Sequence, residues 1–257
     1  MSVSQTGQRL LCTDLDGTFI GDDESMYELL RLLAGRDILL VFSSGRHLQS
    51  ISEMEKQKGI RHPDAYICMV GTEIYFVRDG QPVRDEGWSR IIAEGWDRAR
   101  IQQIAGGFKE LAEQDEEWQS EFKASYFLTR NQEQVMSEMR RLVRQAGIRA
   151  DMIYSGGQFL DLVPSAAGKA DAIYYVARHY GVASGDIVVS GDSGNDIDMF
   201  RAGFKGIIVA TAQPELRDFQ GDNVYRAAEG YAAGIIEGLR YFGFLAASPG
   251  AASATHR

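Results

Sequence analysis

The chain has 257 residues, of which 44% are hydrophobic and 25% are charged. This length and composition are typical of a globular protein with one large domain or two modest ones, and they exclude fibrous and disordered classes. The formal net charge of −9 argues against non-specific binding to nucleic acid, which requires a basic surface.

The sequence also bears on cellular location. The first nine residues are polar and lack the apolar segment of a secretory signal, and no apolar run is long enough to span a membrane. Cys12 and Cys68 fall in apolar segments, so we expect both to be buried and to form neither a disulfide nor a zinc site. We therefore expect a cytoplasmic protein that binds neither membranes nor nucleic acid.

The first apolar run, at 10–13, predicts a buried strand that ends in a polar turn. The period of two of a strand places Asp14 and Asp16 on the same side. Gly17 then allows the backbone to turn and to approach a ligand closely. An ordinary polar turn explains this stretch equally well when it is taken alone, because Asp and Gly are common turn residues.

Helices and strands then alternate. Helical spacing of apolar residues predicts helices at 24–34 and 47–58, and continuous apolar runs predict strands at 38–42 and 65–70. The strand at 38–42 leads into Ser44. Such alternation predicts an α/β fold with a parallel sheet, in which the ligand site lies beyond the carboxyl ends of the strands.

A different pattern follows. A β-hairpin with Asp79 and Gly80 in its turn is predicted at 73–85, and the segment at 88–117 is mostly helical by period. This segment and the elements after it predict a compact α+β insertion with its own sheet, which we place at 87–163. The other elements expected in the insertion are strands at 121–128, 149–154 and 158–163 and a helix at 131–146.

The alternating pattern returns after the insertion, so residues 1–86 and 164–245 are expected to form one core domain. The composition of 246–257, which is rich in Ala and Ser, predicts a disordered tail. The elements expected in the second half of the core are helices at 166–180, 196–202 and 231–242 and strands at 186–190, 206–209 and 224–225.

Four polar features stand at strand ends or helix starts of this core. Each one alone could be a cap, a turn or a solvated side chain. Together they make chemical sense, because four converging carboxylates need a divalent cation, and oxygen ligands beside a phosphate suit magnesium. A hydroxyl and an ammonium group would then stabilise a transferring phosphoryl group, one carboxylate could attack, and another could transfer protons. The features are Asp14 with Asp16, Ser44, Lys169, and Asp192 with Asp196.

In this order the four features resemble the motifs of the haloacid dehalogenase (HAD) superfamily of phosphatases, and the insertion resembles the type IIB cap. The likeness runs from about residue 10 to residue 242. Other stretches resemble the sucrose-6-phosphate phosphatase family and the related mannosylfructose-phosphate phosphatases. These stretches are 70–75, 123–126, 154–157, 160–161 and 213–216.

The resemblance implies a Rossmann-like HAD core and a Mg²⁺-dependent reaction through an aspartyl-phosphate. Asp14 would attack phosphorus. Asp16 would protonate the departing sugar oxygen and then activate water. The metal would be held by the Asp14 carboxylate, the Asp16 backbone carbonyl and Asp192, with Asp196 nearby.

The resemblance also implies that Ser44 and Lys169 bind the phosphoryl oxygens, although the neighbouring Ser43 leaves open which hydroxyl acts. The chain departs from the family pattern at one place. The family usually has Asn-Ala before its x-Pro-Glu motif, whereas this chain has Thr211 and Ala212. We therefore assign Thr211 no role.

Specificity is expected to come from the insertion, because a lid that closes over the crevice can contact the part of the substrate remote from phosphorus. Sugar hydroxyls need paired donors and acceptors, and polar side chains of the insertion and of the facing core supply them. The predicted substrate-binding residues are Lys123, Ser125, Tyr126, Gln158 and Asp161 in the insertion and Gly45, Arg46, Glu73 and Asn195 in the core.

The sequence thus predicts a phosphatase for a phosphorylated disaccharide, either sucrose-6-phosphate or mannosylfructose phosphate. A phosphatase or phosphomutase for another sugar phosphate is one alternative. A non-catalytic module that binds sugar phosphates as a partner of a synthase is another, and the intact Asp14 and Asp16 argue against it. We expect a monomer or a weak homodimer, with the cognate synthase as the macromolecular partner that the resemblance suggests.

Overall fold

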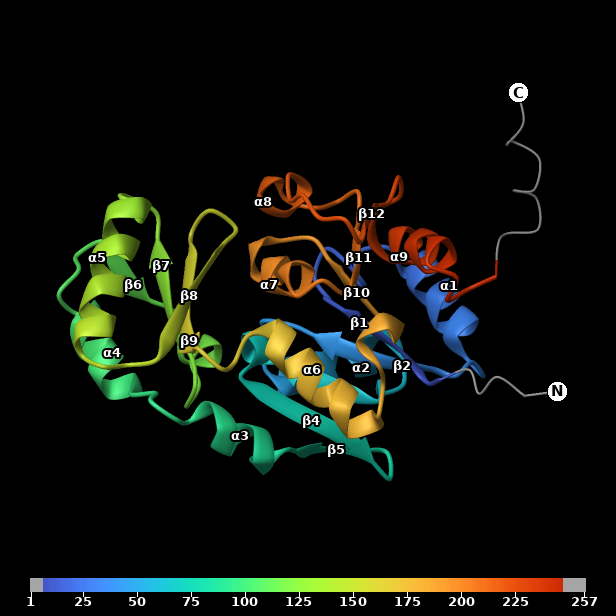
Figure 1. The fold of residues 1–257 in the computed structure, drawn as a ribbon, viewed down its shortest axis with the longest axis horizontal. Helices are drawn as coiled ribbons and strands as arrows, with labels where there is room; N and C mark the ends of the chain where they lie inside the picture. Colours follow the sequence, from blue (N-terminus) through green and yellow to red (C-terminus); the bar gives the residue numbers. More distant parts are fainter. Residues whose placement is uncertain (1–6, 247–257) are drawn as a thin grey trace.

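The computed structural model describes residues 7–246. A large sheet with helices on both faces forms the core, and a smaller sheet with two helices forms the insertion beside it (Figure 1). The predicted tail lies almost entirely outside the described residues. No helix in the described range has the length and hydropathy that a membrane span requires.

The core sheet has eight strands in the order β12-β11-β10-β1-β2-β3-β4-β5. The six strands from β12 to β3 are parallel, and β4 and β5 are antiparallel additions at the edge. Because β1 lies between β10 and β2, the carboxyl ends of these three strands are neighbours. The strands are β1 (Arg9–Thr13), β2 (Ile38–Ser43), β3 (Ala65–Cys68), β4 (Glu73–Arg78), β5 (Gln81–Arg84), β10 (Ile187–Gly191), β11 (Lys205–Ile208) and β12 (Val224–Arg226).

Helices cover both faces of this sheet, which explains why its strands are continuously apolar. Along β1, for example, Leu10 and Cys12 pack into one hydrophobic cluster and Leu11 into the other. Both cysteines are buried, as expected, and both are free thiols. One face carries α1 (Asp23–Leu33), α2 (Leu48–Lys58) and α9 (Tyr231–Tyr241), and the other carries α3 (Glu86–Ile92), α6 (Lys169–Tyr180), α7 (Ile197–Arg201) and α8 (Pro214–Arg217).

The insertion contains a four-stranded antiparallel sheet in the order β6-β7-β9-β8. Its two helices lie on the side of the sheet away from the core, on the left in Figure 1. Apolar side chains such as Met139 and Leu160 fill the space between the helices and the sheet. The elements are α4 (Arg98–Ala105), β6 (Leu111–Glu113), β7 (Ala124–Leu128), α5 (Gln132–Gln145), β8 (Ala150–Ser155) and β9 (Phe159–Pro164).

Most predicted elements are present, with three differences. The segment at 88–117 contains the strand β6, which has no periodic signal of its own and forms by pairing with β7. The strand expected at 65–70 ends at Cys68, because Met69 and Val70 adopt positive φ angles in a turn. The helix expected from residue 166 begins at Lys169.

The position of α3 bears on the limits of the insertion. Trp88 and Ile92 belong to a hydrophobic cluster of the core, and the Trp88 indole donates to the Gly71 carbonyl at 3.0 Å. This packing places α3 with the core and favours a boundary near Ala93 in place of residue 87.

Candidate active site

Three strand ends meet at one cavity of about 450 Å³. Asp14 follows β1, Ser44 follows β2 and Asp192 follows β10, and all three residues line the cavity. Asp16 and Asn195 line it as well. The neighbouring positions of β10, β1 and β2 in the sheet therefore bring the predicted motifs together, as expected for a parallel sheet.

Lys169 lies at the centre of this arrangement. It is the first residue of α6 and is fully buried. Its Nζ atom donates to Asp14 Oδ1 at 2.8 Å, to Asp196 Oδ1 at 2.6 Å and to Asn195 Oδ1 at 3.1 Å. Burial opposes the charge of Lys169, but the two carboxylates outweigh it and raise the pKa of this ammonium group, so it stays charged.

Three carboxylates surround this single ammonium group. Asp14, Asp192 and Asp196 each offer an oxygen within 4.8 Å of those of the other two. Burial, followed by Asp196 and Asp192, raises the pKa of Asp14 well above its usual range, although Lys169 opposes the shift. Burial and Asp196 raise the pKa of Asp192 to about 7. The excess of negative charge and the all-oxygen donor set fit a hard divalent cation.

The three carboxylates differ in the donors they already bind. Asp196 Oδ1 accepts from Lys169, and its Oδ2 accepts from the backbone amides of Asp192 at 3.0 Å and Ser193 at 3.1 Å. Within residues 7–246, the Asp192 carboxylate accepts one hydrogen bond, from the Thr18 hydroxyl at 3.4 Å. Asp192 is therefore more available to a cation than Asp196.

The loop after β1 packs closely against Asp192. Gly17 has a φ of +81°, and a Cβ atom there would lie 2.4 Å from Asp192 Oδ2, so only glycine fits. The Thr211 hydroxyl donates to the Gly17 carbonyl at 2.8 Å. Thr211, to which the sequence assigned no role, thus holds the loop that carries Asp14 and Asp16.

Asp16 has different surroundings from Asp14. Its side chain is 56% exposed, whereas that of Asp14 is 7% exposed. Arg46 binds it through two contacts, Nε to Oδ2 at 2.7 Å and Nη2 to Oδ1 at 2.5 Å. Both aspartates line the cavity, but only Asp14 belongs to the buried cluster around Lys169.

The structure also distinguishes the two serines. Ser44 lines the cavity, and its hydroxyl accepts a bond from the Arg46 amide at 3.2 Å. The Ser43 hydroxyl is buried, does not line the cavity, and has no hydrogen-bond partner among residues 7–246. The geometry therefore places Ser44, and not Ser43, at the cavity.

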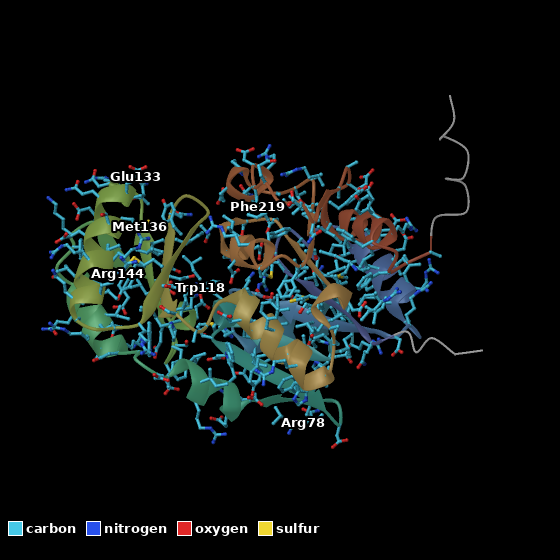
Figure 2. All side chains as sticks on the ribbon, in the orientation of Figure 1. Arg78, Trp118, Glu133, Met136, Arg144 and Phe219 are labelled. Atoms are coloured by element: carbon cyan, nitrogen blue, oxygen red, sulfur yellow. The ribbon has the colours of Figure 1, made fainter. Side chains whose placement is uncertain are left out.

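A second cavity, of about 400 Å³, adjoins the first and is lined by both domains. Gly45 and Asn195 line both cavities from the core, and Trp118 and Phe159 do so from the insertion. Figure 2 shows Trp118 at the junction of the two domains. The predicted substrate-binding residues Lys123, Gln158 and Asp161 line only the second cavity.

A polar cluster forms one wall of the second cavity. Asp161 Oδ1 accepts from the Ser125 hydroxyl at 2.6 Å and lies 3.5 Å from Lys123 Nζ. Ser125 is fully buried and holds Asp161 from behind. Burial lowers the pKa of Lys123, and Asp161 only partly opposes this effect.

Ser125 and two further predicted substrate-binding residues line neither cavity. Side chains alternate along β7, so Tyr126 points away from Ser125 and packs into the hydrophobic cluster of the insertion. Glu73 lies at the start of β4, where its carboxylate accepts from the Tyr75 hydroxyl at 2.8 Å. The same alternation places Phe127 on the cavity side, a residue that the sequence analysis did not select.

Comparisons of sequence identify similar proteins. A family model described as sucrose-6F-phosphate phosphohydrolase matches residues 7–243. Sucrose-phosphatase 1 of Nicotiana tabacum is 32% identical over 93% of this chain and 60% of the tobacco protein. Mannosylfructose-phosphate phosphatase of Agrobacterium fabrum is 30% identical over 91% of this chain and 97% of that protein. The chain thus spans about 60% of the length of the curated plant relatives.

Comparison of structure gives the same result. The sucrose-phosphatase of Synechocystis sp. PCC6803, solved in complex with sucrose and phosphate, matches with a TM-score of 0.85 and 34% identity. The match covers 92% of this chain and 98% of that chain. Structures of the HAD type match at lower identity and share the fold. The predicted fold class, a Rossmann-like α/β core with an inserted α+β unit, is confirmed.

Proposed function

The chain belongs to the sucrose-6F-phosphate phosphohydrolase family, and from this premise we propose that it is a Mg²⁺-dependent phosphatase for a phosphorylated disaccharide. The observation that carries the proposal is the buried cluster of Asp14, Lys169, Asp192 and Asp196 beside a cavity shared with the insertion. A phosphoryl group would enter the first cavity and its sugar would enter the second.

The acidic cluster supports a Mg²⁺ site in the first cavity. The carboxylates of Asp14 and Asp192 and the backbone carbonyl of Asp16 would hold the ion. Asp196, whose oxygens are already bound, would position its neighbours. When bound, the ion would offset the negative charge of the carboxylates and of the phosphoryl group.

Asp14 is the proposed nucleophile. Lys169 binds its Oδ1 atom, and Oδ2 would attack phosphorus, so that an oxygen–phosphorus bond forms while the bond from phosphorus to the sugar oxygen breaks. The Ser44 hydroxyl and the Lys169 ammonium group would bind the phosphoryl oxygens. Water would then attack the aspartyl-phosphate, which releases phosphate and restores Asp14.

Asp16 is the proposed acid and base. It would donate a proton to the departing sugar oxygen in the first step and accept one from water in the second. In this structure Arg46 holds the Asp16 carboxylate at the edge of the first cavity. The exposure of Asp16 would allow its side chain to rotate away from Arg46 toward the reacting oxygen.

The second cavity supports a disaccharide as the remote part of the substrate. Its volume of about 400 Å³ falls in the range of small-molecule sites. Lys123, Gln158 and Asp161 offer donors and acceptors for sugar hydroxyls, and Trp118 and Phe159 offer apolar faces for the rings. The proposal includes both sucrose-6-phosphate and mannosylfructose phosphate as substrates. Relatives named for each have a similar sequence identity to this chain.

Phosphate release from a panel of sugar phosphates tests this proposal. We expect one of the two disaccharide phosphates to have the highest kcat/KM, and we expect a chelator to abolish turnover and added Mg²⁺ to restore it. A monosaccharide phosphate with a higher kcat/KM, or transfer of the phosphoryl group to a second sugar, would replace the proposal with the alternative phosphatase or mutase. Tight binding of the sugar phosphates without turnover would favour the non-catalytic module.

The assembly and location of the protein also remain proposals. We propose a small-molecule substrate and a monomer or weak homodimer, which sedimentation velocity over a range of concentrations would test. Association with a synthase and a cytoplasmic location rest on the sequence analysis alone.

A further inference from the structure

A third cavity, of about 530 Å³, lies where the insertion meets the core. We call it the junction cavity. Its walls come from α5 and β8 of the insertion and from α7 and the 194–195 segment of the core. A cavity of this volume between two domains is a common setting for a small-molecule site, and the proposed reaction does not use it.

Arginine side chains dominate the charge of the junction cavity. Arg140 and Arg144 lie one turn apart on α5, Arg149 precedes β8, and Arg201 ends α7. Figure 2 labels Arg144 on α5. Arg149 is paired with Glu94 at 2.9 Å. The side chains of the other three form no hydrogen bond or ion pair with any residue between 7 and 246.

Two carboxylates also line the junction cavity, but other donors bind them. Asp198 accepts from the backbone amides of Ala170 at 3.0 Å and Met199 at 2.8 Å. Asp151 accepts from the Ser165 hydroxyl at 3.1 Å. Three arginines without a partner in the described structure therefore face two carboxylates that are already engaged, and the cavity is locally basic.

This local charge is unusual for the chain as a whole. The protein has a formal net charge of −9, so its general field repels anions. Like charges four residues apart on a helix also repel each other, and Arg140 and Arg144 have this spacing. An anion between these two side chains would relieve the repulsion.

We propose that the junction cavity binds a small phosphate-bearing anion, which contacts the insertion through Arg140 and Arg144 and the core through Arg201. A guanidinium group presents paired donors that match the oxygens of a phosphoryl group. The volume of about 530 Å³ suits a small metabolite and not a macromolecule.

The site is connected to the first cavity through one segment. Asn195 lines the junction cavity and also accepts a bond from Lys169 Nζ at 3.1 Å. An anion in the junction cavity would therefore touch the segment that helps to hold Lys169, and it would bridge the insertion and the core.

Calorimetric titration of the full chain with inorganic pyrophosphate, in the presence of excess Mg²⁺, tests the proposal. We expect the double variant Arg140→Ala/Arg144→Ala to bind pyrophosphate in this cavity about tenfold more weakly or not at all, because two charge-assisted contacts are lost. The matched control is Arg130→Ala/Arg141→Ala, which removes the same charge from exposed positions outside the cavity. We expect the control to bind as the unmodified protein does.

A second pair of variants tests the bridge between domains. Arg201→Ala should also weaken binding, whereas Arg178→Ala, on the neighbouring α6, should not. Competitive inhibition of phosphate release by pyrophosphate reports the first cavity separately, and it should be the same in all four variants.

Three results would overturn the proposal. The first is a titration that shows a single binding event with the same affinity as the competitive inhibition, because the first cavity alone would then explain the binding. The second is equal loss of affinity in the two double variants, which would indicate general electrostatics. The third is equal affinity for citrate, which would show that the site does not select phosphoryl groups.

Discussion

Two buried lysines, one in each domain, show how differently the core and the insertion use the same type of side chain. Lys169 in the core lies within 2.8 Å of the carboxylates of Asp14 and Asp196, and its pKa is raised. Lys123 in the insertion lies 3.5 Å from the single carboxylate of Asp161, and its pKa is lowered. Both ammonium groups are almost completely excluded from water.

The two lysines differ in how completely nearby carboxylates compensate the charge of the ammonium group. The Lys169 ammonium group is tightly paired with two carboxylates, and such fixed charges suit an electrostatic reaction centre. Lys123 is incompletely paired, so it gains more from a new acceptor such as a sugar hydroxyl. We therefore interpret the core cluster as the chemical centre and the Lys123 cluster as a recognition site, and the following variants test this division.

Replacement of the proposed nucleophile should have the largest effect. An amide oxygen is a poor nucleophile, so Asp14→Asn should lower kcat for phosphate release about 10⁴-fold. The exposed residue Asp222 provides a control, and Asp222→Asn should leave kcat unchanged. Full activity of Asp14→Asn would contradict the assignment of the chemical centre to Asp14.

Loss of the central cation should affect stability as well as activity. Lys169→Met leaves the Asp14 and Asp196 carboxylates buried without their ammonium partner, so the free energy of unfolding should fall by about 3 kcal/mol. Urea denaturation measures this change, with Lys109→Met at an exposed position as the control. A change below about 1 kcal/mol would contradict the tight pairing that distinguishes Lys169 from Lys123.

The contact between the two domains should have a smaller effect. A Cβ atom on Gly194 would lie 2.9 Å from the Tyr154 carbonyl oxygen, so Gly194→Ala should displace the β8–β9 hairpin from the core. We expect kcat/KM to fall roughly 10- to 100-fold. A Cβ atom on Gly185 would have no other atom within 4 Å, so Gly185→Ala serves as the control. An unchanged kcat/KM in Gly194→Ala would show that catalysis does not depend on this contact between the insertion and the core.

The smallest expected effect concerns the loop that carries the aspartates. Thr211→Val keeps the shape of the side chain but removes the bond to the Gly17 carbonyl, so kcat should fall about fivefold. KM should change less, because Thr211 lines neither the first nor the second cavity. A pure increase in KM would argue against a positioning role.

The core site could be predicted from the sequence because its residues follow apolar strands. Asp14, Ser44 and Asp192 each follow a strand of one parallel sheet, and the topology alone brings those strand ends together. The contact of Thr211 with Gly17 joins residues 194 positions apart and leaves no local signal. It is accessible only from the folded structure.

The insertion was harder to predict for a different reason. Which side chains of its sheet line the cavity depends on which face of the sheet packs toward the core. The motif at 123–126 does not contain that information. Ser125 and Tyr126 were selected together, although alternation along β7 must separate them. The short strand β6 has no periodicity of its own and forms only through its pairing with β7.

The division between chemistry and recognition is tested most directly by comparing two substrates in one variant of the insertion. We would measure kcat and KM of the unmodified protein and of Lys123→Met for the preferred disaccharide phosphate and for fructose 6-phosphate. The account predicts that KM for the disaccharide phosphate rises about tenfold while its kcat and both constants for fructose 6-phosphate stay unchanged. A fall in kcat for both substrates would contradict it, because Lys123 would then contribute to the chemical step.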